Sequence, residues 1–210
     1  MLQFQKVQKA FGSRMILDIP AMDLAAGIYW LQGPNGSGKT SLLRMLAGIL
    51  PFEGRILLQG LSLQKDPVAY RHSVGWADAD PLYPDFLSGA DLLAFYKGIQ
   101  RPRPGQIEEL TNRFAVRPWL SSRTSTWSSG MTKKISLLLA FIGQASLIVL
   151  DEPLVTLDED GVDTLYALIG EYHTQFGTSF LLSSHQDIPA NRLPNIKNLI
   201  VYNKSIQLIQ

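Results

Sequence analysis

Cysteine is absent from this sequence of 210 residues, which excludes disulfide bonds and cysteine-ligated metal centres. An excess of one charge sign is absent too. The 19 basic and 18 acidic residues are spread along the chain and give a formal net charge of +1. The sequence therefore has no polybasic stripe, which would be the sign of a nucleic-acid partner. We find no internal repeats and no low-complexity tracts.

Long hydrophobic runs are also lacking. The longest uncharged stretch, 135–150, is shorter than a membrane span and contains Gly143, Gln144 and Ser146, so it predicts a buried helix that turns into a buried strand. Residues 1–14 alternate apolar and polar side chains and have no hydrophobic core of a signal peptide, which predicts a first strand. Because 46% of the residues are apolar, we expect one soluble α/β domain with an inserted subdomain.

The sequence contains a phosphate-binding pattern. Residues 33–40 read GPNGSGKT, between a short apolar strand pattern at 28–31 and a helix pattern that begins near Lys39. A glycine-rich turn without a ligand is the alternative, but the flanking strand and helix favour a nucleotide site. The residues expected around the phosphates are Gly33, Pro34, Asn35, Gly36, Ser37, Gly38, Lys39, Thr40 and Ser41.

The chemistry of such a loop follows from its backbone. Successive N–H groups turn inward around the β-phosphate, and the helix N-terminus adds partial positive charge. The glycines permit positive φ values and close approach of the ligand. Lys39 is expected to reach the β- and γ-phosphates, and the Thr40 hydroxyl is expected to bind Mg²⁺.

The rest of the chain keeps the α/β pattern apart from one segment. Residues 54–60 predict a strand, and residues 81–126 contain five prolines among helical patterns, which predicts a mostly helical insert. The pattern resumes with a strand at 147–150, a helix at about 161–176 and a strand at 179–183. Residues 198–202 and 205–209 predict a hairpin around Asn203-Lys204.

Two carboxylates follow the strand at 147–150. Asp151 and Glu152 would emerge at the carboxyl edge of the sheet, where a phosphate loop also opens. There Asp151 is expected to hold Mg²⁺, and Glu152 to orient or deprotonate an attacking water. The alternative is that both acids cap the turn before Pro153. His185 follows the strand at 179–183 and should emerge at the same edge, although a lone histidine is a weak signal.

The segment between the insert and these acids resembles the ABC-type ATPases. Residues 127–131, WSSGM, stand where that family usually has LSGGQ, and a helix and the acidic strand follow in the family's order. Phe11 stands where an aromatic side chain stacks on adenine, Leu157-Asp158 where the D-loop pair stands, and Ser184-His185 at the switch histidine. The resemblance covers essentially the whole chain.

The resemblance implies a RecA-like P-loop NTPase core, at about 1–78 and 147–210, with an antiparallel β edge and an inserted α-helical signature subdomain at about 79–146. It also implies head-to-tail pairing, as a homodimer or with a related ATPase subunit, around two ATP molecules. Ser128, Ser129, Gly130 and Asp158 would then meet ATP bound by the other chain, and His185 would contact the γ-phosphate.

Two positions depart from the family's pattern. Ser129 replaces a signature glycine and adds a side chain at the approach of the opposing nucleotide. Ala79 stands where the family has a glutamine that approaches Mg²⁺ and the attacking water. Asp78 or Asp80 could supply oxygen ligands instead, and a role as solvated turn acids is the alternative. For Phe11 the alternative is a place in the core.

The resulting hypothesis is an ATP-hydrolysing subunit that powers a membrane ABC transporter and lies on the cytoplasmic face of the membrane, bound to a permease on another chain. The signature and the His185-Gln186 pair resemble exporter or ABC-2-type components. The runner-up is a nucleotide-gated dimerising module with little hydrolysis. A soluble ABC protein of DNA repair or translation and a small-molecule kinase rank lower, and the transported substrate cannot be named from the sequence.

Overall fold

The strands form two sheets in the computed structural model, which describes residues 1–185, 188–189, 191–193 and 195–209. The larger sheet has the order β10-β9-β3-β8-β7-β6 and is parallel except for its edge strand β10. Its strands are β3 (Ile28–Gln32), β6 (Val74–Ala77), β7 (Leu147–Leu150), β8 (Ser179–Ser183), β9 (Lys197–Tyr202) and β10 (Ser205–Ile209).

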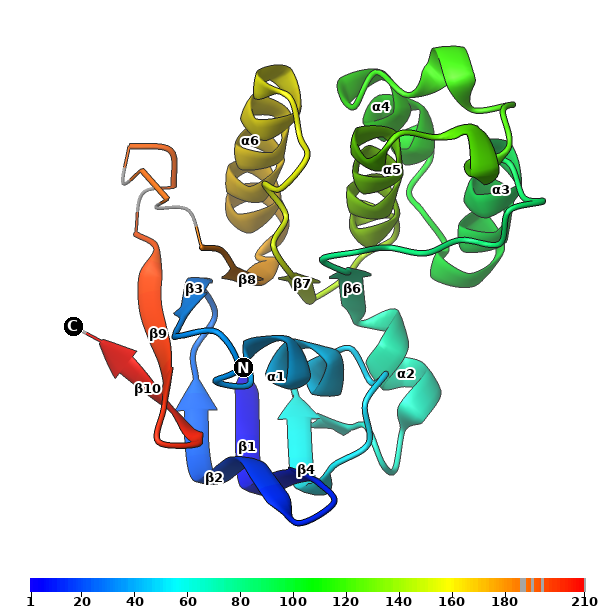
Figure 1. Cartoon of the computed structure of the whole chain (residues 1–210). Coiled ribbons are helices and arrows are strands. Elements are labelled where there is room, and N and C mark those ends of the chain that lie inside the picture. The colour runs from blue at the N-terminus through cyan, green and yellow to red at the C-terminus, as the bar shows by residue number, and fades with distance from the viewer. Residues whose placement is uncertain (186–187, 190, 194, 210) are drawn as a thin grey trace.

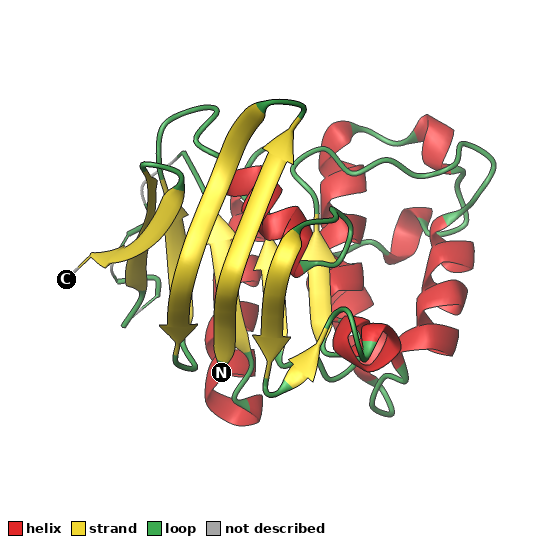
Figure 2. Cartoon of the chain, turned by 90° about the horizontal axis from the view of Figure 1, so that it is seen from below, coloured by secondary structure: helices red, strands yellow, loops and turns green. Residues whose placement is uncertain are grey.

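The smaller sheet is antiparallel and has the order β2-β1-β4-β5. Seen from below, its strands cross the front of the molecule (Figure 2). They are β1 (Leu2–Phe11), β2 (Arg14–Leu24), β4 (Glu53–Leu58) and β5 (Leu61–Ser62). The amide of Asp18 donates to the carbonyl of Lys204 at 2.6 Å and so ties β2 to the turn before β10.

The helices cover both faces of the larger sheet. Helix α1 lies between the two sheets, while α5 and α6 lie on the opposite face with α3 and α4 beside α5 (Figure 1). The helices are α1 (Lys39–Leu46), α2 (Pro67–His72), α3 (Gly89–Gln100), α4 (Gln106–Arg113), α5 (Ser129–Phe141) and α6 (Glu159–Phe176). In the part of the chain that the structure describes, none of them is long and apolar enough to cross a bilayer.

The position of strand β7 explains why residues 147–150 form a continuous apolar run. All four of its residues are buried. Leu147 and Val149 pack in the cluster that contains α1, and Ile148 and Leu150 pack in the cluster that contains α5 and α6. Because helices or strands cover both of its faces, the strand needs apolar side chains at every position.

The helical segment before β7 packs onto the sheet through α5. Helix α3 begins with a capping box between Ser88 and Asp91, and both α3 and α4 contact α5, which in turn contacts β6 and β7. One hydrophobic cluster runs from α3 and α4 through α5 to the sheet. The helical lobe therefore rests on the same core as the strands that carry the site.

The predicted α/β fold, with a parallel sheet and an antiparallel edge, is confirmed. The C-terminal hairpin has Asn203 and Lys204 at positive φ, with Tyr202 opposite Ser205, as a two-residue turn requires. Helix α6 begins two residues before the predicted start because the Asp158 side chain caps it. Strands β2, β5 and β6 and helix α2 were not predicted.

Candidate nucleotide site at the carboxyl edge of the sheet

The phosphate loop joins β3 to α1 and leaves the start of that helix open. Gly36 and Gly38 have φ values of +75° and +108°, and a Cβ on Gly38 would lie 3.0 Å from a methyl of Ile16. Glycine is therefore required at Gly38 both by conformation and by space. Helix α1 has no side-chain cap and no acidic residue in its first turn, so its first N–H groups can donate to a phosphate.

Lys39 is held over the loop by backbone carbonyls. Its Nζ donates to the carbonyl oxygens of Gly33 at 2.7 Å and of Pro34 at 3.3 Å. The side chain is buried, and no ion pair to Lys39 occurs among the residues that the structure describes. A buried ammonium bound only by carbonyls gains strongly from an anionic ligand.

A cavity of about 360 Å³ brings eight of the predicted site residues together. Its volume lies within the range of about 300–1,000 Å³ for small-molecule sites. Its lining contains Arg14, Ile16, Asn35, Gly36, Gly38, Lys39, Thr40, Ser41, Glu152 and His185. A neighbouring hollow of about 560 Å³ shares Arg14, Ile16 and Gly36 and extends to the hairpin residues 201–204. The nucleotide site therefore has space beyond the phosphates.

Arg14 and Ile16 are site residues that the sequence analysis missed. Both lie at the start of β2, directly after the turn that follows Phe11. Their only sequence signal is nearness to Phe11, because β2 meets the phosphate loop through tertiary packing and not through a local motif.

Asp151 has a carboxylate oxygen that is suited to bind a cation. It is buried, and its Oδ1 accepts a hydrogen bond from the Ser183 hydroxyl at 2.6 Å. Its Oδ2 is buried without a hydrogen-bond partner. An unpaired buried carboxylate oxygen is costly, and a hard cation with oxygen ligands would complete it. Among the described residues no group of three or more His, Asp or Glu side chains is arranged to hold a metal ion by itself, so Mg²⁺ would also need Thr40 and phosphate oxygens.

Glu152 and His185 meet at the mouth of the cavity. The backbone N–H of His185 donates to Glu152 Oε2 at 3.2 Å, and His185 Nε2 lies 3.4 Å from Glu152 Oε1. Glu152 has a φ of +45°, a conformation that costs about 1–3 kcal/mol in a non-glycine residue and occurs where the surroundings enforce it. The predicted convergence of these two residues is present. Gln186, the other half of the pair noted in the sequence, lies outside the described residues.

The signature residues lie elsewhere. Ser128 is the N-cap of α5, and its Oγ accepts from the Met131 N–H at 3.2 Å. Ser128 and Ser129 are exposed, and a Cβ on Gly130 would lie 2.9 Å from the carbonyl oxygen of Thr156. None of the three lines the cavity around Lys39. The phosphate loop and the signature of one chain therefore present two separate surfaces.

The carboxylate of Asp158 is hydrogen-bonded to residues of its own chain. Its Oδ1 accepts from the Gly161 N–H at 3.0 Å and caps α6, while its Oδ2 accepts from Lys134 Nζ at 2.7 Å. The hydrogen bond from Lys134 lowers the pKa of the Asp158 carboxyl. Because Lys134 lies on α5, this ion pair links the start of α6 to the signature helix.

Phe11 is not a core residue, so that alternative is wrong. Its side chain is 51% exposed at the end of β1, and the ammonium of Lys9 lies 4.7 Å from its ring centroid. A cation at this distance from an aromatic ring is attracted to it. Phe11 does not itself line the cavity, so its stacking on adenine stays a prediction.

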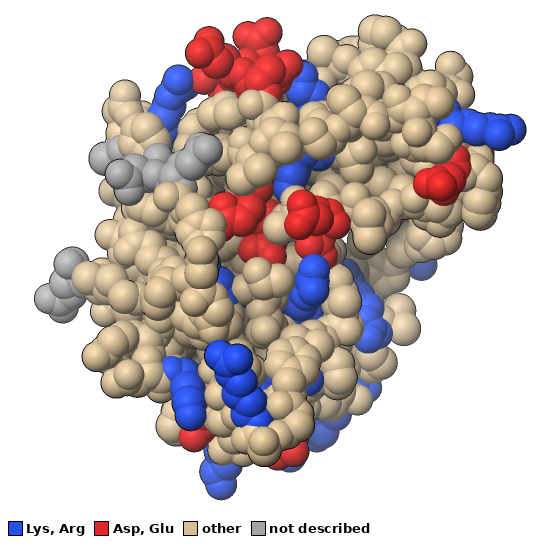
Figure 3. Space-filling view, in the orientation of Figure 1, with Lys and Arg blue, Asp and Glu red and all other residues tan. Residues whose placement is uncertain are grey.

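The loop after β6 differs from the expectation for its acids. Asp78 is neither a free oxygen ligand nor a solvated turn acid, because both of its carboxylate oxygens accept from Arg44 on α1, at 3.1 and 3.2 Å. Asp80 is exposed. Ala79 has only a methyl group to offer, and its carbonyl accepts from the buried Lys133. Acidic side chains gather in the hollow at the middle of this face, with basic side chains beside them (Figure 3).

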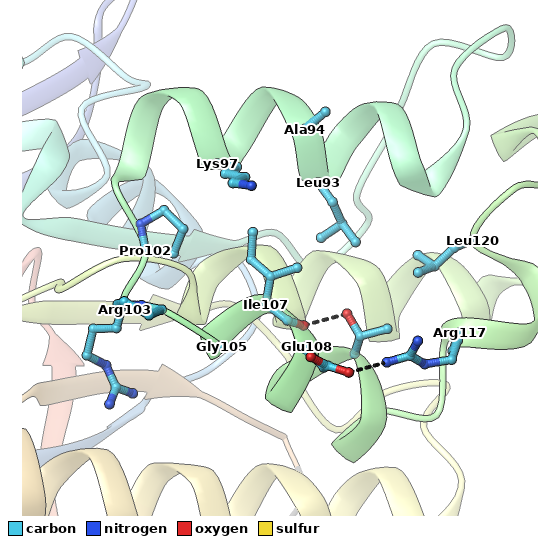
Figure 4. Close-up of a pocket in the computed structure, with 12 residues that line it drawn as sticks. Leu93, Ala94, Lys97, Pro102, Arg103, Gly105, Ile107, Glu108, Arg117 and Leu120 are labelled. Atoms are coloured by element: carbon cyan, nitrogen blue, oxygen red, sulfur yellow. Dashed lines mark hydrogen bonds and ion pairs between the residues drawn. The ribbon is translucent and has the colours of Figure 1, made fainter.

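A separate hollow lies in the helical lobe between α3 and α4 (Figure 4). Its volume of about 640 Å³ exceeds that of the cavity at the phosphate loop. Arg117 is paired with Glu108 at 3.2 Å, Arg103 points away from the hollow, and no phosphate-loop residue lines it. The chemistry of phosphate binding therefore belongs to the smaller cavity.

Comparison with known proteins agrees with this geometry. The sequence pattern of the family described as "ABC transporter" matches residues 21–155. The chain belongs to the ABC transporter family. This ABC subunit binds ATP and is an ATPase.

Two curated relatives carry the name "Cytochrome c biogenesis ATP-binding export protein CcmA". The protein from Histophilus somni is 30% identical over 202 residues, covering 93% of this chain and 92% of its own. The protein from Haemophilus influenzae is 31% identical over 212 residues, covering 96% of both. This ABC subunit thus aligns with such relatives along nearly their whole length.

Solved structures show the same fold. One described as "Structure of ATP binding subunit of ABC transporter" has a TM-score of 0.88 at 22% identity and covers 100% of this chain and 90% of its own. The ATP-binding cassette MJ0796, in a dimeric post-hydrolysis state with ADP and Pi, has a TM-score of 0.81 at 14% identity and covers 100% and 99%. The predicted P-loop NTPase fold class is therefore confirmed.

Proposed function

We propose that this ATPase subunit hydrolyses Mg-ATP in the cavity at the phosphate loop and thereby powers export through a separate membrane permease. The observation that carries the proposal is the convergence of Lys39, Thr40, Glu152 and His185 on one cavity, beside the unpartnered Oδ2 of Asp151. Cation, phosphates and attacking water each have matching side chains there. The proposal divides the chain into a core at about 1–78 and 147–210 and a helical lobe at about 79–146.

Each residue has a defined task in this mechanism. The N–H groups of the loop and the Lys39 ammonium bind the β- and γ-phosphates. Thr40 and Asp151 would hold Mg²⁺, which neutralises charge on the phosphate oxygens when it is bound. Glu152 accepts the proton of the attacking water at a carboxylate oxygen, and His185 orients that carboxylate and donates toward the γ-phosphate.

The separation of the signature from the cavity supports pairing with a second ATPase chain. The site of one chain lacks the donors that Ser128, Ser129 and Gly130 would supply, and these residues lie at the start of α5, where both serines are exposed. A helix N-terminus of this kind suits a γ-phosphate oxygen presented by another molecule. We infer ATP-dependent pairing, with a second copy or a related subunit.

Substitution of Glu152 tests this mechanism. In Glu152→Gln the shape and hydrogen-bonding capacity persist but the carboxylate is gone, so hydrolysis should fall by about 10² or more while ATP binding persists. Light scattering should then show a dimer stabilised by ATP. As a binding control, Lys39→Ala should weaken Mg-ATP affinity in calorimetry. Wild-type turnover by Glu152→Gln, or a monomer at saturating ATP, would exclude the mechanism.

The segment before and within α3 supports a permease partner. Leu82 and Phe86 are 93% and 73% exposed, and Phe95 and Ile99 on α3 are exposed as well. Large apolar side chains concentrated on an exposed segment favour a protein interface. The permease, which would hold this subunit on the cytoplasmic face of the membrane, is the proposed occupant.

Charge substitutions in this segment test the permease surface. In Leu82→Glu and Phe86→Glu, co-purification with the co-expressed permease should be lost, while ATP hydrolysis by the isolated subunit should stay within about twofold, because neither side chain lines the ATP cavity. Val68→Glu, at another exposed apolar side chain, serves as the control. Full co-purification of the Leu82 and Phe86 variants would contradict this surface.

We propose export as the direction of transport, and the names of the relatives support it. Their printed names describe export in cytochrome c biogenesis, which favours export over import for this subunit. The geometry of the ATP site does not depend on the cargo, so the proposal extends to direction and not to substrate.

A further inference from the structure

Lys133 joins three segments of the molecule at one atom. It lies in the second turn of α5 and is 2% exposed. Its Nζ donates to the carbonyl oxygens of Asp78 at 3.0 Å and Glu152 at 3.3 Å, and also to the carbonyl oxygen of Ala79. One ammonium thus connects the signature helix, the loop after β6 and the residue proposed as general base.

The burial of this ammonium requires a reason. Moving a cation out of water is costly, and all three donors of a lysine must then be satisfied. Burial lowers the pKa of Lys133, while Asp80, Asp151, Asp78 and Glu152 oppose that shift. A methionine would fill the same volume without this cost. The polar end of the side chain is therefore explained by the carbonyls that it binds.

Glu152 shows what these contacts accomplish. Its N–H donates to Ser183 Oγ at 3.1 Å, and its carbonyl accepts from Lys133 at 3.3 Å. Both polar groups of its backbone are therefore anchored, while its φ is +45°. A strained conformation persists only where several contacts enforce it. Lys133 supplies one of these contacts from the helix that begins with the signature.

We propose that Lys133 is a positioning residue for ATP hydrolysis, which fixes Glu152 and the Asp78-Ala79 loop relative to the signature helix. The inference rests on the proposed function, because it assumes that Glu152 handles the proton. In a chain whose loop has Ala79 where a glutamine is expected, Lys133 gives that loop a fixed place beside the cavity. A movement of α5 then moves the general base directly.

The test separates turnover from binding. In Lys133→Met the length and the apolar stem persist but the ammonium is lost, so kcat should fall at least tenfold while the Kd for Mg-ATP should change less than threefold. Lys133→Gln keeps two amide donors and should give a kcat between those of wild type and Lys133→Met. Lys97→Met, at an exposed lysine on α3, is the control and should keep wild-type kcat.

A second readout follows the loop itself. Hydrogen exchange of the peptide covering residues 78–82, without nucleotide, should be at least tenfold faster in Lys133→Met and unchanged in Lys97→Met. If Lys133→Met does not fold, Lys133→Gln is compared with wild type by the same two measurements, and faster exchange together with reduced kcat at unchanged Kd is expected.

Three results would overturn the inference. They are wild-type kcat in the Lys133 variants, unchanged exchange in the 78–82 peptide, and a fall in kcat that only matches a fall in the number of ATP-binding sites titrated by calorimetry, which would show a general loss of folded protein. Glu152→Gln distinguishes the two proposals. If Glu152→Gln abolishes hydrolysis while the Lys133 variants keep full kcat, the positioning role fails and the proposed function stands.

Discussion

Removal of the Ser183 hydroxyl should destabilise this protein and impair hydrolysis together. The hydroxyl donates to Asp151 Oδ1 at 2.6 Å and accepts from the Glu152 N–H at 3.1 Å, at a fully buried position. It therefore holds both strand-end acids with one atom. In Ser183→Ala both contacts vanish, and the methyl group that remains can replace neither.

The magnitude follows from these two hydrogen bonds. The bond to the carboxylate is worth about 1.5–3 kcal/mol, and the buried N–H left unpaired costs about 1–3 kcal/mol. Because the two losses share one atom, they do not add fully, and we expect a loss of about 3 kcal/mol in the free energy of unfolding. For a chain of this size that corresponds to a fall in Tm of about 6–12 °C.

Urea unfolding without nucleotide measures this loss. The midpoint should fall while the m-value stays constant, because the surface exposed on unfolding is unchanged. Ser125→Ala, at an exposed serine in the helical lobe, should change the free energy by less than about 0.5 kcal/mol. A Ser183→Ala variant as stable as Ser125→Ala would refute the reasoning.

Two further predictions concern the loop after β6 and the contact between α4 and α6. Ala79→Gln should raise steady-state ATP turnover, since positioning groups supply most of the protein's contribution to phosphoryl transfer. If Asp80 instead positions the cation and the attacking water, Asp80→Asn should lower turnover sharply and Ala79→Gln should change it little. Unchanged turnover in both variants would show that this loop takes no direct part in catalysis. Hydrogen bonding from Arg113 lowers the pKa of Glu171 below its ordinary 4.5, so this pair stabilises the fold above pH 4.5 and loses that contribution as the pH falls through the lowered value. Glu171→Gln should lower the free energy of unfolding by under about 1 kcal/mol at pH 7, because the pair is partly exposed, and should not change it at a pH below the lowered pKa. Urea unfolding at several pH values measures this, and a difference between variant and wild type that stays constant across pH would contradict the prediction.

The parts of the site that lie in contiguous sequence could be predicted. The phosphate loop is one uninterrupted pattern, and Asp151-Glu152 follow a strand whose four apolar residues are recognisable on their own. Their meeting at the carboxyl edge follows from the parallel arrangement of β3, β7 and β8. Local pattern and sheet geometry together therefore suffice to find the residues that we propose to bind phosphate and cation.

The contacts made across the fold could not be predicted. Arg14 reaches the cavity only because β2 packs beside the phosphate loop, and Asp78 meets Arg44 from a helix 34 positions earlier in the chain. Lys133 reads as a polar position near the start of a helix, yet it is buried. These contacts are set by tertiary packing, which cannot be predicted from the periodicity or spacing of residues in the sequence.

The position of β3 has a consequence for how the protein comes to be folded during synthesis. This strand leads directly into the phosphate loop, and its neighbours in the sheet are β8 and β9, with Ile28 beside Phe180 and Leu31 beside Leu199. The antiparallel strands β1, β2 and β4 can pair soon after they leave the ribosome. The strand that carries the loop must wait until β8 and β9 are made, so the contact order of the nucleotide site is high and its assembly is late. A nascent chain that ends before β8 would fold its antiparallel sheet and still be unable to bind ATP.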